Sequence, residues 1–244
     1  MDQDLNGRVV VITGAAGGIG TAMAEAFATV GARLALVDIV DPGELACRLG
    51  PDHAAWSCDL EDPAEIARVV AEIGDRMGID VLINNAGLGI VFPAEVTRIE
   101  DWDRTQAINL RAPWLMAAAA LPYLKASGRG RGVNIASQAG IIAIAEHAAY
   151  GASKAGLIGL TKVLALEWAR FGITVNAISP TVVETPMALV GWSGEKGERA
   201  RAAIPVGRFA KPSEIAHAAV YLASAGAGIV NGENMVMDGG FTVQ

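Results

Sequence analysis

The chain has 244 residues, of which 52% are hydrophobic and 29 are glycine, so it is long enough for one large α/β domain with a buried core. Its formal net charge of −7 argues against a nucleic-acid partner, because such partners are bound by basic surfaces. The two cysteines and three histidines show neither a disulfide framework nor the spacing of metal ligands, so we expect no metal site.

Neither a targeting signal nor a membrane span is expected. The first seven residues are mostly polar and lack the apolar core of a secretory signal, which predicts a cytoplasmic protein. The longest uncharged run, 215–232, contains histidine, serine, asparagine and glycine. We interpret it as a helix, a turn and the approach to a strand rather than as a membrane-spanning helix.

Short β-rich runs alternate with helix-like runs along the whole chain. Strands are predicted at 8–14, 33–38, 54–57, 81–87, 132–137, 173–180 and 234–237. Most of them are almost continuously apolar, which is typical of strands covered by helices on both faces. Helical periodicity lies between them, at 20–32, 63–78 and 149–171. We therefore predict an α/β fold in which residues 1–244 form a single domain around a doubly wound parallel sheet of about seven strands.

Two helical stretches are apolar around most of their circumference: 113–124 and the helix that follows Tyr150. A helix of this kind must be buried on more than one side. In a single-domain protein the additional side is often a subunit interface, so we expect a homo-oligomer with closed symmetry. Deep burial within one subunit is the alternative.

The first predicted strand runs into a glycine-rich loop, Thr13–Gly20, and then into a helix. The glycines at 14, 18 and 20 allow a sharp turn and a close approach of the backbone to a ligand. The start of the following helix offers free N–H groups and the positive end of the helix dipole to a pyrophosphate. Tight turns also need glycine, so the loop gains its weight from its place after the first strand.

Asp38 ends the second predicted strand, where its carboxylate can accept hydrogen bonds from both hydroxyls of an adenine ribose. The same charge would repel a 2′-phosphate, and the next residues, Ile39 and Val40, supply no cation for one. This pattern favours NAD over NADP as the cofactor. The alternative is that Asp38 is an ordinary residue of the turn.

Two further stretches follow predicted strands at the same edge of the sheet. Asp59, in "CDL", could accept a hydrogen bond from the adenine amino group, and "NNAG" at 84–87 forms a turn of small residues. Either one alone could be an ordinary turn. Together, at the carboxyl ends of successive strands, they outline one ligand site.

Tyr150 and Lys154 lie four residues apart in "AEHAAYGASKAGLIGL", a spacing that places both side chains on one face of a helix. The pKa of a free phenol is about 10, and a nearby ammonium favours its ionised form. A tyrosine whose pKa is lowered in this way is suited to general acid–base work. Taken alone, the pair could equally form a surface contact.

Taken together, these motifs resemble the short-chain dehydrogenase/reductase family over essentially the whole chain. The resemblance rests on Thr13-Gly14-x-x-x-Gly18-x-Gly20, Asn84-Asn85-Ala86-Gly87, Asn109, Ser137 and Tyr150-x-x-x-Lys154, in that order. It implies a Rossmann-type sheet of seven strands, a nicotinamide cofactor, a carbonyl/alcohol redox reaction and a tetrameric assembly. Hydride transfer takes place on the cofactor, while the protein orients and stabilises the reactants.

The resemblance also implies roles for four residues. Tyr150 exchanges a proton with the substrate oxygen, and Ser137 hydrogen-bonds that oxygen. Lys154 lowers the pKa of Tyr150 and binds the nicotinamide ribose, and Asn109 bends its helix and holds a water that leads to Lys154. The implied cofactor site comprises Gly14, Gly18, Ile19, Gly20, Asp38, Asp59, Leu60, Asn85, Ala86, Gly87, Tyr150, Lys154, Pro180, Val183 and Thr185.

The chain departs from the family pattern after the sixth predicted strand, where Thr181 follows Pro180 in place of the usual glycine. This narrows the space expected over the nicotinamide. Val183 is expected to offer its backbone to the carboxamide of the nicotinamide, and Thr185 its hydroxyl.

The segment 186–208 is expected to form a lid over the substrate, lined by Met187, Leu189 and Trp192. Gln138, Ile141, Glu146 and His147 are expected near the pocket, and their mixture of polar and apolar groups suits a polyol or a sugar alcohol.

The resulting prediction is an NAD-dependent dehydrogenase that interconverts a secondary alcohol and its ketone, with a small-molecule substrate as its partner. One alternative is a reductase of 3-oxoacyl groups on a carrier protein, which resembles the same family but generally uses NADPH. The other is a non-catalytic dinucleotide sensor that uses the fold for binding alone.

Overall fold

The computed structural model describes residues 5–244, apart from the side chains of Met187 and Val190. Seven parallel strands form one sheet in the order β3-β2-β1-β4-β5-β6-β7. The strands are β1 (Val9–Thr13), β2 (Arg33–Asp38), β3 (Ala54–Ser57), β4 (Val81–Asn84), β5 (Arg131–Ile135), β6 (Thr174–Pro180) and β7 (Asn234–Met237). This confirms the predicted parallel sheet of seven strands.

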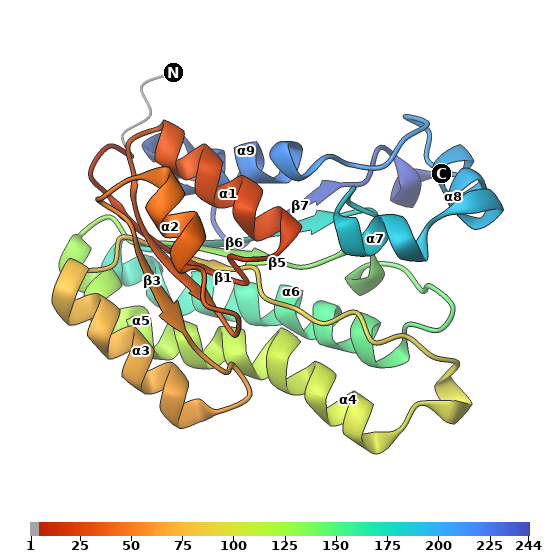
Figure 1. The fold of residues 1–244 in the computed structure, drawn as a ribbon, viewed down its shortest axis with the longest axis horizontal. Coiled ribbons are helices and arrows are strands. Elements are labelled where there is room, and N and C mark those ends of the chain that lie inside the picture. Colours follow the sequence, from red (N-terminus) through yellow and green to blue (C-terminus); the bar gives the residue numbers. More distant parts are fainter. Residues whose placement is uncertain (1–4) are drawn as a thin grey trace.

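Helices cover both faces of the sheet (Figure 1). They are α1 (Gly18–Thr29), α2 (Gly43–Leu49), α3 (Pro63–Met77), α4 (Ile99–Gln106), α5 (Ala112–Ser127), α6 (Ala148–Trp168), α7 (Pro186–Gly191), α8 (Gly194–Ala202) and α9 (Pro212–Ala223). One apolar core lies between the sheet and the layer of α1 and α9, and a second lies between the sheet and the layer of α3, α5 and α6. The strands are buried from both sides, which explains their continuously apolar sequences.

Local signals account for the limits of several elements. The side chain of Asp62 caps α3 by accepting a hydrogen bond from the Ala64 N–H at 2.7 Å, and Pro63 occupies the first helical position. Strand β4 ends at Asn84, three residues earlier than predicted, because the Asn85 side chain donates hydrogen bonds to the carbonyl oxygens of Thr13 and Gly14. These bonds join the end of β4 to the glycine-rich loop.

The order in which successive strands are added to the sheet reverses between β1 and β4. Val10 of β1 pairs with Leu34 of β2 on one side and with Val81 of β4 on the other. The connections from β1 therefore leave to opposite sides, and a crevice opens at the carboxyl ends of these two strands. The glycine-rich loop after β1 and the turn at 84–87 after β4, both predicted to bind a ligand, lie at this crevice.

The two apolar helices leave large side chains in solvent. Trp114 on α5 is 50% exposed, and Val163 and Leu166 on α6 are 50% and 80% exposed. Burial within one subunit therefore does not account for their apolar character. No helix in the described part of the chain is long and apolar enough to cross a membrane.

Candidate active site

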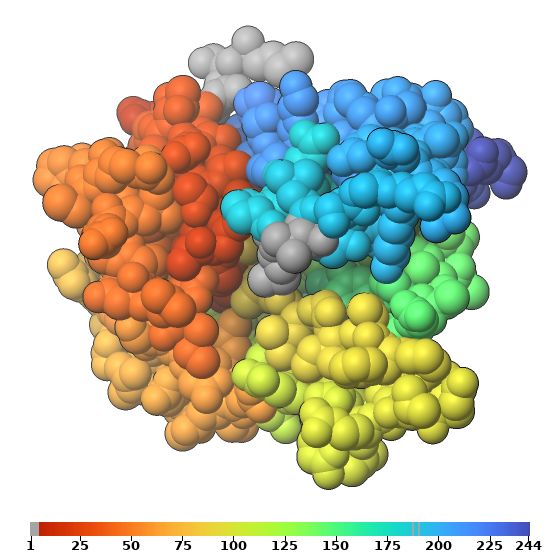
Figure 2. Space-filling model, turned by 45° about the vertical axis from the view of Figure 1, so that its right-hand side comes forward, coloured from red at the N-terminus to blue at the C-terminus, as the bar shows by residue number. Residues whose placement is uncertain are grey.

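A cavity of about 770 Å³ lies at the carboxyl ends of the central strands. Its walls come from the ends of β5 and β6, the first turns of α6, the loop after β4 and the segment that carries α7 and α8. In the space-filling view, a hollow separates the cyan and blue segment around residues 180–205 from the yellow segment around residues 90–100 (Figure 2). Ser137, Tyr150 and Lys154 all line the cavity.

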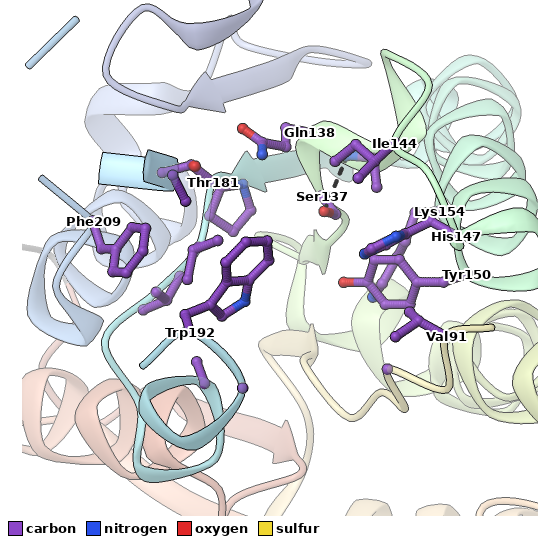
Figure 3. Close-up of a pocket in the computed structure, with 18 of the residues that line it drawn as sticks. Val91, Ser137, Gln138, Ile144, His147, Tyr150, Lys154, Thr181, Trp192 and Phe209 are labelled. Atoms are coloured by element: carbon purple, nitrogen blue, oxygen red, sulfur yellow. Dashed lines mark hydrogen bonds between the residues drawn. The ribbon is translucent and has the colours of Figure 1, made fainter. Parts of the chain in front are cut away.

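Tyr150 and Lys154 extend from the first two turns of α6 toward the end of β5 (Figure 3). The Lys154 Nζ lies 5.7 Å from the centre of the Tyr150 ring and donates a hydrogen bond to the Ile135 carbonyl at 2.7 Å. Lys154 is only 4% exposed. Lys154 is thus buried and Tyr150 is half-buried, and both line the cavity, so the pair is not a surface contact.

Burial governs the pKa values of both groups. It lowers the pKa of Lys154 to about 8, because the ammonium loses its hydration. It raises the pKa of the Tyr150 phenol, and the nearby Ser137 hydroxyl opposes this effect only in part. The expected lowering of the Tyr150 pKa by Lys154 is therefore wrong for this structure. The loss of hydration around the phenol outweighs the other effects on it.

Ser137 follows β5 and is held by a short 3₁₀ turn, Gln138–Gly140. Its Oγ accepts a hydrogen bond from the Ala139 N–H at 3.2 Å, shown dashed in Figure 3. Tyr150 also lines the cavity, so its hydroxyl and that of Ser137 face the same space. Two hydroxyls that converge on one oxygen are suited to stabilise an alkoxide.

Asn109 is fully buried in a π-helical turn, Ala107–Arg111, that joins α4 to α5. Its Oδ1 accepts a hydrogen bond from the Leu88 N–H at 2.8 Å, and its Nδ2 donates to the Leu88 carbonyl at 2.9 Å. Nδ2 also lies 3.1 Å from the Ser153 Oγ on α6. Asn109 thus ties the loop after β4 to the helix that carries Tyr150 and Lys154.

The glycine-rich loop fits a dinucleotide pyrophosphate. Gly14 has a φ of +65°, and a Cβ on Gly20 would lie 2.0 Å from the Gly14 carbonyl oxygen, so side chains are excluded at both positions. Gly17, the residue before α1, provides no side-chain cap, and the first turn of α1 carries no acidic residue. The N–H groups at the start of α1 are therefore available to phosphate oxygens.

Asp38 lies at the end of β2 against this loop. Its two carboxylate oxygens accept hydrogen bonds from the N–H groups of Ala16, at 2.9 Å, and Val40, at 3.1 Å. Each oxygen keeps a further lone pair with which it can accept a ribose hydroxyl. The Asp59 Oδ1 accepts from the Glu61 N–H at 2.8 Å, and the neighbouring Leu60 is buried.

The remaining predicted cofactor contacts follow β6. Pro180 is buried at the end of the strand, and Thr181, 7% exposed, lines the cavity. The Thr185 Oγ1 caps α7 by accepting a hydrogen bond from the Ala188 N–H at 3.2 Å. A Cβ on Gly18 would lie 2.9 Å from the Thr185 Cγ2, so the start of the predicted lid lies directly against the glycine-rich loop.

The residues expected to line the lid lie in different places. Trp192 lines the cavity, and its ring meets Phe209 edge to face with 6.3 Å between ring centres. Leu189 is 45% exposed and does not line the cavity. The side chain of Met187 lies outside the described residues.

Of the other residues expected near the pocket, some line the cavity and one does not. Gln138, Glu146 and His147 line the cavity, whereas Ile141 is 42% exposed and does not. Sequence reasoning missed Val91, Ile144, Phe209 and Phe241, which also line it. Val91, Phe209 and Phe241 reach the cavity through the packing of segments distant in the chain, whereas Ile144 lies in the stretch between Ser137 and Tyr150 that was expected near the pocket.

A model of the family described as enoyl-(acyl carrier protein) reductase matches residues 14–242. D-threitol dehydrogenase from Mycolicibacterium smegmatis is 46% identical over 249 residues, covering 100% of this chain and 96% of that protein. The chain belongs to the short-chain dehydrogenase/reductase family. As a member of this family, it is an oxidoreductase that uses a nicotinamide cofactor, NAD(P).

Two further short-chain dehydrogenases bear on the cofactor. An NAD-dependent glycerol dehydrogenase from Listeria innocua is 44% identical over 248 residues, covering 100% of this chain and 98% of that protein. A solved structure from Beutenbergia cavernae, provisionally assigned as an NAD(P)-dependent gluconate 5-dehydrogenase, has NADP bound at low occupancy. It is similar with a TM-score of 0.95 and 36% identity, and each chain covers 100% of the other.

Proposed function

We propose that this protein oxidises a secondary alcohol of a polyol to the ketone, with NAD as the hydride acceptor. The observation that carries this proposal is that Ser137, Tyr150 and Lys154 line one cavity next to the glycine-rich loop. Two of the similar dehydrogenases are named for polyols, threitol and glycerol, which supports a polyol as the substrate class.

In this proposal, Tyr150 moves the proton and Ser137 holds the reacting oxygen. The proton of the substrate hydroxyl passes to the Tyr150 Oη during oxidation and returns from it during reduction. When bound, the nicotinamide supplies the hydride acceptor. Because burial raises the pKa of Tyr150, its phenol is protonated at neutral pH, which suits reduction. Oxidation needs the phenolate and is therefore expected to speed up as the pH rises.

Lys154 and Asn109 are proposed to bind the cofactor and to position the groups around Tyr150. The ammonium of Lys154 lies beside the Tyr150 ring and close to Gly87, so it can hold a ribose hydroxyl bound at the cavity. Asn109 holds the loop at Leu88 against α6 and is proposed to position a water that leads to Lys154. The segment 186–208 is proposed to act as the substrate lid.

The choice of NAD over NADP rests on Asp38. Its carboxylate lies against the glycine-rich loop, where the adenine ribose of a bound dinucleotide is expected, and would repel a 2′-phosphate. The Listeria relative is named as NAD-dependent, whereas the Beutenbergia structure holds NADP, so the relatives use both cofactors.

A homo-oligomer, dimer or tetramer, and a cytoplasmic location are part of the same proposal. The exposed apolar side chains of α5 and α6 support the oligomer. They include Trp114, next to a groove of about 570 Å³ that is also lined by Leu110 and Leu160.

The experiment that tests this function is NADH formation by the purified protein. Glycerol, threitol and other polyols are offered with NAD and, in parallel, with NADP at mildly alkaline pH. Tyr150→Phe removes the proton acceptor and is expected to lower kcat by about 100-fold or more, while NADH binding, measured by fluorescence, is retained. Wild-type kcat in this variant would contradict the assignment of Tyr150.

Two other outcomes of this experiment would favour a different function. A preference for NADP would overturn the interpretation of Asp38 and favour a reductase of acyl groups on a carrier protein, in line with the description of the family model. NADH binding without turnover of any alcohol or ketone would favour a dinucleotide sensor.

A further inference from the structure

Gln138, directly after Ser137, is part of the wall of the cavity and carries a buried amide oxygen. The residue lines the cavity and is only 7% exposed. Its Oε1 is buried and has no hydrogen-bond partner. In the described part of the chain, no other cavity-lining side chain has a buried oxygen or nitrogen without a partner. An unpaired buried amide oxygen costs about 1–3 kcal/mol, so a structure keeps one only where something offsets that cost.

Two backbone hydrogen bonds fix the main chain at Gln138. The Gln138 carbonyl accepts hydrogen bonds from the N–H groups of Ile141 at 2.9 Å and Ile142 at 3.0 Å. The same turn packs on α6, since a Cβ on Gly140 would lie 2.7 Å from the carbonyl carbon of Lys154. The backbone of Gln138 is therefore anchored to the helix that carries Tyr150 and Lys154, so the point from which its side chain extends is fixed.

The polar groups of the cavity are unevenly distributed. Figure 3 shows Gln138 beyond Ser137, on the side away from Tyr150. Ile144, Trp192 and Phe209 make other parts of the wall apolar. Glu146 and Lys196 also line the cavity but are exposed to solvent. Thr181 is also buried and polar in this wall, but of the two only Gln138 carries a buried side-chain oxygen without a hydrogen-bond partner.

We propose that Gln138 binds the hydroxyl on the carbon next to the reacting carbinol, and that this contact selects vicinal diols and polyols over mono-alcohols. A hydroxyl both donates and accepts, so either end of the amide can serve the contact. A mono-alcohol leaves the amide unpaired, which favours the substrate with the second hydroxyl. The inference rests on the proposed function and identifies the residue that decides its substrate class.

The test compares 2,3-butanediol with 2-butanol, which share a carbon skeleton and differ by one hydroxyl. kcat and KM are measured for both alcohols with the wild type, Gln138→Met and Ile144→Leu. Methionine keeps the length of the side chain and removes the amide, whereas Ile144→Leu changes the shape of the cavity and removes no polar group. Thermal melting and NADH binding show that each variant is folded, and Gln138→Leu replaces Gln138→Met if the latter does not fold.

Gln138→Met is expected to lower kcat/KM for the diol by about 10-fold or more, chiefly through a higher KM, because the lost hydrogen bond is made before the chemical step. The effect on 2-butanol is expected to be less than about threefold, so the preference for the diol falls by nearly the whole factor. Ile144→Leu is expected to leave the preference unchanged. If the wild type oxidises 2,3-butanediol and not 2-butanol, the preference is at its extreme and no ratio can be formed. In that case kcat/KM for the diol is compared between the two variants, and a larger loss in Gln138→Met than in Ile144→Leu supports the role of Gln138.

An unchanged preference in Gln138→Met, or an equal loss in Ile144→Leu, would overturn the role of Gln138 and leave the proposed function intact. If the wild type oxidises neither alcohol nor any polyol with NAD or NADP, the proposed function fails, and the inference fails with it.

Discussion

Lys154 shows how burial controls the chemistry of a single residue. Its pKa is lowered to about 8, whereas the unfolded chain keeps the ordinary value of 10.5. Between these two values the unfolded chain binds the proton more tightly than the folded chain, so stability rises with pH across this window and is lost as the pH falls through about 8. We expect the unfolding free energy of the wild type to rise, relative to that of Lys154→Met, by on the order of 2 kcal/mol between about pH 7.5 and 9.5.

Urea unfolding without added cofactor, at several pH values and one protein concentration, measures this difference. The Lys154→Met variant has no group to titrate at this position and therefore serves as the reference curve. Parallel curves for the two proteins would show that Lys154 titrates at its ordinary pKa in the folded chain, and that its burial has no such effect.

At the scale of elements, the close approach of β1, its loop and α1 builds the dinucleotide end of the site. A Cβ on Gly20 would lie 2.0 Å from the Gly14 carbonyl oxygen, which forces the loop apart. We expect Gly20→Ala to weaken NADH binding by about 10-fold or more and to lower the unfolding free energy by about 1–3 kcal/mol. NADH fluorescence titration and thermal melting measure the two effects.

A glycine elsewhere in the chain provides the matched control. Gly159 is exposed on α6, and a Cβ there meets no atom within 4 Å. Gly159→Ala is therefore expected to leave the fold of the single chain undisturbed and to keep NADH binding. Equal NADH affinity in Gly20→Ala and Gly159→Ala would contradict the role given to the loop.

At the scale of the whole molecule, the exposed apolar faces of α5 and α6 predict an assembly. We expect the wild type to elute as a dimer or tetramer. The double variant Trp114→Glu/Leu166→Glu is expected to have a lower mass, because two charges buried in an interface would lack partners. Both residues are at least 50% exposed in the single chain, so the changes do not disturb its core. Size-exclusion chromatography with light scattering measures the masses.

The same change at an exposed apolar residue away from these helices is the control. Ile229 is 96% exposed and follows the turn Ala225–Ala227. Ile229→Glu is expected to leave the α5 and α6 interface intact, so the mass of the assembly stays that of the wild type. A monomeric wild type, or a double variant of unchanged mass, would rule out this interface.

Local patterns in the sequence were enough to predict the sheet. The apolar runs and turn residues that define β1 to β7 act over a few positions, and all seven ranges correspond to strands of the structure. The polar helix α8 was expected only as part of a lid, because its sequence lacks an apolar face. The end of β4 was misplaced, because the bonds from Asn85 to the glycine-rich loop bridge some 70 residues of chain.

For the site, the sequence by itself determined the set of reactive groups and their order: the glycine-rich loop, Asp38, Ser137, Tyr150 and Lys154. These follow from short spacings and from the strand ends at which they fall. Only the tertiary structure decided the raised pKa of Tyr150, the exposure of Leu189 and the unpaired amide of Gln138. The physical reason is that burial and the loss of hydration depend on what packs around a group, and much of that packing comes from segments distant in the chain.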